Sequence, residues 1–137
     1  MYMVAMLFGA RLRPVHGCFG GAMVTVEDVA EQLELEVAAG NGRLGREVTG
    51  GYVGDLLSCV MARAARGNLW VTVQGHPNVV AVAALVGIAA IVIAEGARID
   101  ASTLDKAEQE GIPILSTRKP AFSVVAELAA MGVKGNE

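Results

Sequence analysis

Strand-like and helix-like patterns alternate three times in the second half of the chain, and this alternation constrains the fold more than any other feature. Each run rich in β-branched residues is followed, after a short connection, by an Ala-rich or amphipathic segment. The strand-like runs are 69–74, 90–94 and 112–115, and the helical segments are 79–86, 103–110 and 121–131. Such alternation favours parallel strands with right-handed crossovers and helices on both faces. We therefore predict an α/β three-layer sandwich with a mostly parallel sheet of about five strands.

The first half of the chain supplies weaker signals for the remaining elements. Thr25 and Asp28 have the spacing of a helix capping box. Alternation of apolar and polar residues predicts two short strands. Polar turn residues follow them, and the next helix is expected to begin at Gly54 or Asp55. The expected short strands are 35–39 and 47–49.

Composition limits both the core and the classes of partner. Hydrophobic residues make up 53% of the chain but aromatic residues only 4%, so the core is expected to consist of small aliphatic side chains. A net charge of −3 with scattered basic residues argues against nucleic-acid binding. Cys18 and Cys59 are too few for a disulfide framework, which predicts a reduced, cytoplasmic setting. Cys59 falls on the apolar side of its helix and is expected to be buried.

The longest apolar run, 79–94, does not predict a membrane span. It is shorter than the roughly 20 residues that cross a bilayer. Gly87 divides it into an Ala-rich half and the β-branched stretch 91–93. A buried helix, a turn and a strand therefore explain the run, and no membrane partner is predicted.

Residues 1–22 differ from the rest of the chain. They contain Arg11 and Arg13 after an apolar stretch and have no acidic residue, an order opposite to that of a secretory signal. Two alternatives remain open. Translation begins naturally at Met23, or residues 1–22 form an arm that docks on the domain or on a second copy. We treat 1–22 as an extension and 23–134 as the domain.

Polar residues and glycines gather where the predicted strands end. Because ligands of parallel α/β sheets bind at the carboxyl ends of the strands, these residues are the candidate ligand-binding set. The set comprises Thr49, Gly50, Gly51, Tyr52, Asp55, Gln74, His76, Asn78, Glu95, Ser116 and Thr117. The segment 49–51 is expected to face the turn 74–78, where glycine N–H groups and two helix N-termini would favour a negatively charged group. The alternative is that all these residues are ordinary caps and turn formers.

Familiar catalytic motifs are missing or out of context. The segment 40–45 has the letters G-x-G-x-x-G, but no helix is expected to begin on it, so it predicts a tight turn rather than a dinucleotide site. The sequence contains no phosphate-binding P-loop and no hydrolase nucleophile elbow. His76 is expected to be a turn residue, and Trp70 a core residue. Histidine, cysteine and acidic residues lack the spacing of a metal site, so neither a metal nor a cofactor is predicted.

Several segments together resemble the DRTGG domain family. They are 48–57, 70–73, 76–83 and 111–117, and the resemblance extends from about Val24 to Gly132. Arg46 and the Thr-Gly-Gly of 49–51 are present, but Gly45 stands where an acidic residue would be expected and two residues intervene. The resemblance implies a fold similar to the N-terminal domain of HPr kinase/phosphorylase. It also implies a regulatory role without an established reaction.

These observations favour a stand-alone regulatory or sensory domain that binds a small anionic ligand or a protein partner without catalysis. One alternative is a small enzyme that uses His76 with Asp55 or Glu95 on a phosphorylated metabolite. The other is a purely structural assembly domain. We also expect a homodimer, because the apolar content is high for this length and two segments would offer unpaired surface. They are the N-terminal arm and the strand at Pro113, which lacks a backbone N–H and should lie at an exposed edge of the sheet.

Overall fold

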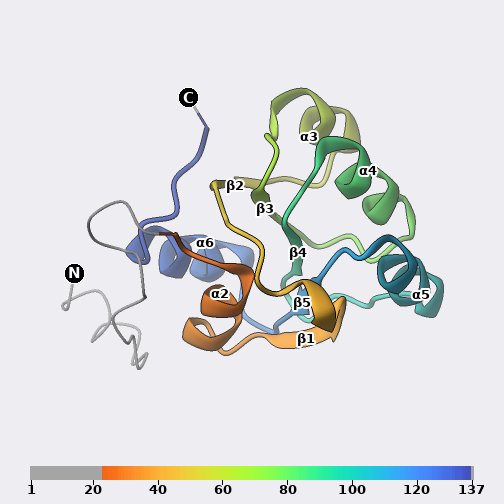
Figure 1. The fold of residues 1–137 in the computed structure, drawn as a ribbon, viewed down its shortest axis with the longest axis horizontal. Coiled ribbons are helices and arrows are strands. Elements are labelled where there is room, and N and C mark those ends of the chain that lie inside the picture. The colour runs from red at the N-terminus through yellow and green to blue at the C-terminus, as the bar shows by residue number, and fades with distance from the viewer. Residues whose placement is uncertain (1–22, 137) are drawn as a thin grey trace.

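The computed structural model describes residues 23–136, so the expectations for residues 1–22 lie outside the described part of the chain. Its sheet has five strands in the order β1-β5-β4-β3-β2 (Figure 1). All neighbours are parallel except β1 and β5. The strands are β1 (Glu36–Ala39), β2 (Gly50–Val53), β3 (Asn68–Thr72), β4 (Ala90–Ile93) and β5 (Ile114–Ser116). The predicted α/β fold with a mostly parallel, five-stranded sheet is confirmed.

Helices cover both faces of the sheet and create two apolar cores. One face carries α2 (Val26–Gln32) and α6 (Ala121–Ala130), and the other carries α3 (Leu57–Arg63), α4 (Asn78–Val86) and α5 (Ala101–Glu110) (Figure 1). Successive strand residues alternate between the cores. Leu69 and Val71 belong to the core under α2 and α6, whereas Trp70 belongs to the core under α3, α4 and α5 and is fully buried.

Local sequence signals explain where several elements begin and end. The capping box is present, because the Asp28 N–H donates to Thr25 Oγ1 at 3.2 Å and the Thr25 N–H donates to Asp28 Oδ2 at 2.9 Å. The turn at 40–45 contains only the short 3-10 helix η1 (Asn41–Arg43). Gly40 has φ = 75°, and a Cβ there would lie 2.5 Å from Pro113 Cα. The glycines of this segment therefore serve a tight turn, as predicted.

Two element boundaries in the first half differ from the prediction. No strand forms at 47–49, where Glu47 makes only an isolated bridge with Thr25, and β2 begins at Gly50 instead. Helix α3 begins at Leu57 rather than at Gly54 or Asp55. The reason is that Asp55 directs its carboxylate at β3 and does not cap a helix.

The prediction that the strand after Pro113 lies at a sheet edge is wrong. Strand β5 lies between β1 and β4, and Pro113 precedes it. The Pro113 carbonyl accepts a hydrogen bond from the Ile91 N–H at 2.9 Å, so the missing N–H does not interrupt the ladder. Cys59 is half-buried rather than buried. Within residues 23–136, no helix has both the length and the hydropathy needed to cross a membrane.

Candidate functional site

The carboxyl edge of the sheet is closed by a network around Asp55. Its Oδ1 accepts from Thr72 Oγ1 at 2.7 Å and from the Val73 N–H at 2.9 Å. The Gln74 side-chain amide donates to the Asp55 backbone carbonyl, and the indole Nε1–H of Trp70 donates to the Gly54 carbonyl at 2.8 Å. Asp55 and Gln74 thus meet, and they hold the loop after β2 against the end of β3.

His76 and Asn78 lie at the start of α4, and both are exposed. Nδ1 of His76 accepts a hydrogen bond from the Asn78 N–H at 3.1 Å. The imidazole therefore satisfies one of the N–H groups at the helix N-terminus, in the manner of a capping side chain. His76 is a turn residue, as predicted, and Asn78 is the first residue of α4.

Glu95 and Thr117 join the loops that follow β4 and β5. Glu95 has φ = 65°, and its Oε2 accepts from the Ala121 N–H at 2.9 Å at the start of α6. The Thr117 carbonyl accepts from the Gly96 N–H at 2.9 Å, while Ser116 ends β5. The Glu95 carboxylate therefore caps a helix, where the macrodipole favours a negative charge.

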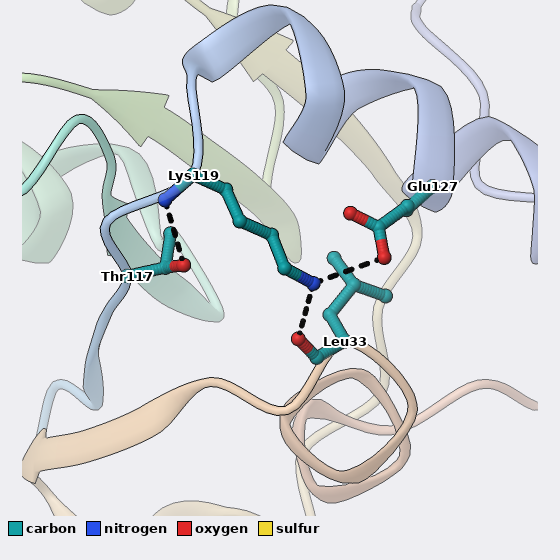
Figure 2. A network of polar contacts seen from close by, with 4 residues as sticks. All are labelled: Leu33, Thr117, Lys119 and Glu127. Carbon is teal, nitrogen blue, oxygen red and sulfur yellow. Dashed lines mark hydrogen bonds and ion pairs between the residues drawn. The ribbon is translucent and has the colours of Figure 1, made fainter. Parts of the chain in front are cut away.

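A lysine connects this corner of the sheet to both neighbouring helices (Figure 2). Lys119 Nζ donates to the Leu33 carbonyl at 2.8 Å and to Glu127 Oε1 at 3.0 Å. The Lys119 N–H also donates to Thr117 Oγ1 at 3.1 Å. Glu127 is only 4% exposed, so Lys119 is the counter-charge of a buried carboxylate and also binds the C-terminal end of α2.

The expectation that 49–51 faces the turn 74–78 is wrong, because the two segments lie at opposite ends of the strands. Gly50 begins β2 and pairs with Asn68 at the start of β3, whereas Gln74 follows the end of β3. Thr49 Oγ1 donates to the Arg66 carbonyl at 2.8 Å. Tyr52 is half-buried in β2 and packs against the core under α3, α4 and α5.

The paired glycines contact the C-terminal tail, 133–136. The Gly51 N–H donates to the Lys134 carbonyl at 2.9 Å, and Gly51 forms a parallel bridge with Gly135. A Cβ on Gly50 would lie 2.8 Å from that same carbonyl oxygen. In this structure the close approach that Gly50 permits is used by the chain's own tail.

Two arginines at the carboxyl edge were absent from the predicted set. Arg98 and Arg118 lie in the loops after β4 and β5, and both are exposed. Within residues 23–136, neither side chain takes part in a hydrogen bond or an ion pair. Their positions in the loops that follow two of the predicted strands were a signal available in the sequence. The described residues contain no group of three histidine, cysteine or acidic side chains placed to hold a metal ion.

The fold and the hydrogen bonds at the carboxyl edge of the sheet together define a three-layer α/β domain. Its loops at that edge are held by bonds within the chain. The sequence model of the DRTGG domain matches residues 28–131, and the protein therefore belongs to the DRTGG domain family. No curated protein matches the chain.

The fold is similar to a crystal structure of the CBS and DRTGG domains of the regulatory region of Clostridium perfringens pyrophosphatase, complexed with the activator diadenosine tetraphosphate. The TM-score is 0.62 at 10% sequence identity, and the match covers 75% of this chain and 45% of that one. At this identity the likeness concerns the fold, and the chain spans less than half of that structure.

Proposed function

We propose that this domain is a regulatory module that binds a small anionic ligand at the carboxyl edge of its sheet and does not catalyse a reaction. The observation that carries the proposal is the pair Arg98 and Arg118, which are exposed on adjacent loops and have no partner among the described residues. Exposed guanidinium groups that have no partner can donate paired hydrogen bonds to phosphate and carboxylate groups. The Gly96 N–H donates to the Thr117 carbonyl, so the two loops that carry these arginines are joined.

The hydrogen bonding of the edge disfavours the enzyme alternative. Acid–base catalysis by His76 would need a nearby carboxylate that is not already engaged in hydrogen bonds within the protein. Asp55 accepts from Thr72 and Val73, and Glu95 accepts from Ala121. Membership of the DRTGG family supports the regulatory role, and the ligand of the similar regulatory region is an anionic dinucleotide.

Isothermal titration calorimetry with diadenosine tetraphosphate, ATP and inorganic phosphate tests the proposal. We expect at least one probe to bind and the double variant Arg98→Gln/Arg118→Gln to weaken that binding by about tenfold or more, because charged hydrogen bonds contribute about 1.5–3 kcal/mol each. The matched control is Arg63→Gln/Arg66→Gln, which removes the same charge at the opposite edge and should leave affinity unchanged. Equal loss in both variants, or no binding of any probe, would contradict the proposed site. Chromatography of the nucleotides after incubation should show no turnover.

We further propose that the domain forms a two-fold homodimer. Large apolar side chains are exposed, including Leu85 at 75% and Phe122 at 87%, and β1 and β2 both present a sheet edge. Light scattering at tens of micromolar should give twice the mass of one chain. A monomer mass under these conditions would be evidence against assembly.

A further inference from the structure

The most exposed large apolar side chain of the described residues lies at the start of α6. It is Phe122, which is 87% exposed and is the second residue of that helix. Exposed apolar residues that lie singly are common on protein surfaces and need no explanation by themselves. Phe122 differs because hydrogen bonds join the start of its helix to the loops that carry Arg98 and Arg118.

Glu95, in the loop after β4, makes two of these hydrogen bonds. Its N–H donates to the Lys119 carbonyl at 2.8 Å, and its carboxylate accepts from the Ala121 N–H at 2.9 Å. Lys119 directly follows Arg118, and Ala121 directly precedes Phe122. Glu95 therefore fixes both ends of the short segment that connects the arginine to the aromatic ring.

The two arginines approach the same loop. The Arg118 Cγ lies 3.6 Å from the position that a Cβ on Gly96 would occupy, so this side chain lies against the loop after β4. Arg98 follows Gly96 by two residues. Phe122 is four residues from Arg118, so their Cα atoms lie at most about 14 Å apart at roughly 3.6 Å per residue. Both guanidinium groups and the ring thus belong to one small part of the carboxyl edge.

We propose that the ligand of this edge is a nucleoside phosphate, whose phosphate binds Arg98 and Arg118 and whose base stacks on Phe122. The inference rests on the anion site proposed above. Two guanidinium groups match the charge and the paired acceptors of a phosphate. An exposed aromatic ring offers a face on which a base can stack. Because Glu95 already caps α6, the phosphate is assigned to the arginines and not to the helix N-terminus.

Calorimetric titration with AMP and ribose 5-phosphate tests the stacking, because both ligands carry the same phosphate and only AMP has a base. The unmodified chain should bind AMP about tenfold more tightly than ribose 5-phosphate. Phe122→Ala should abolish this preference and leave the affinity for ribose 5-phosphate unchanged, whereas Phe122→Tyr should keep it. The control Leu85→Ala truncates an exposed side chain of α4, on the opposite face of the sheet, and should change neither affinity.

The arginines provide a separate measurement. Arg98→Gln/Arg118→Gln should weaken the binding of both ligands by the same factor, about tenfold or more, because both present the same phosphate. Equal affinity of the unmodified chain for the two ligands, or an undiminished preference for AMP in Phe122→Ala, overturns the stacking and leaves the anion site standing. Failure of AMP to bind also overturns the inference, whereas the anion site fails only if diadenosine tetraphosphate, ATP and inorganic phosphate fail as well.

Light scattering determines whether Phe122 serves assembly instead. A two-fold contact through Leu85 on α4 leaves α6 uncovered, because the two helices lie on opposite faces of the sheet. Phe122→Ala should therefore have the same mass in solution as the unmodified chain. A lower mass for this variant would assign the ring to a contact between copies and would overturn its role in binding a base.

Discussion

Replacing Gly75 with alanine is expected to lower the free energy of unfolding by about 3 kcal/mol, the upper range for overpacking a closed site. A Cβ at this position would lie 1.9 Å from the Arg98 carbonyl oxygen and 2.8 Å from Ile99 Cα. The Gly75 carbonyl also accepts from Thr103 Oγ1 at 2.6 Å and from the Asp100 N–H at 3.1 Å. The loop after β3 therefore cannot move away without losing its bonds to the start of α5. Urea unfolding followed by circular dichroism measures the change.

Gly45→Ala is the matched control. Nothing lies within 4 Å of a Cβ at Gly45, and its φ lies outside the left-handed region. Alanine there should leave stability unchanged or raise it by about 0.5 kcal/mol through the unfolded state. If Gly75→Ala is as stable as Gly45→Ala, the close approach to Arg98 is not a constraint on the protein in solution.

Lys119→Met should also destabilise the fold by about 3 kcal/mol, at the low end for breaking a buried ion pair because the lysine side chain is 37% exposed. The substitution keeps the length of the side chain but leaves the Glu127 carboxylate buried without a counter-charge. It also removes the donor to the Leu33 carbonyl. Thermal unfolding at neutral pH provides the measurement.

The double variant Lys119→Met/Glu127→Leu distinguishes two effects on the free energy of unfolding. One is the cost of leaving the Glu127 carboxylate buried without its counter-charge, and the other is the net contribution of the ion pair. Since both charges are then absent, stability should return to within about 1 kcal/mol of the unmodified protein. If the double variant is as unstable as Lys119→Met alone, the isolated Glu127 charge is not the cause, and the lysine acts through its bond to α2.

Periodicity predicted the fold well because burial and local capping act over short distances in sequence. The three strand–helix units, the capping box at Thr25 and the turn at 40–45 all follow from nearest neighbours. The order of the strands in the sheet is harder to predict from the sequence. Pro113 suggested an edge, but β1 adds antiparallel to β5 from the far end of the chain, a pairing that the local residues of β5 do not encode.

The candidate site was only partly predictable for a related reason. Whether a glycine lies before or after a strand depends on where pairing begins, and a shift of three residues moved 49–51 from the carboxyl edge to the amino edge. Asp55 and Glu95 were found at the edge, but their hydrogen-bond partners come from β3 and α6, which sequence spacing cannot reveal. Arg98 and Arg118 could have been included, since their loops were already predicted.

The hydrogen bond between the Trp70 indole and the Gly54 carbonyl gives the protein a built-in optical reporter. Trp70 is the chain's one tryptophan, it is fully buried, and its bond partner immediately precedes Asp55 at the carboxyl edge. Indole fluorescence depends on the polarity and hydrogen bonding of the ring. A ligand that shifts the loop after β2 would therefore change the emission without unfolding the core, so occupancy of the edge can be followed in the unlabelled protein.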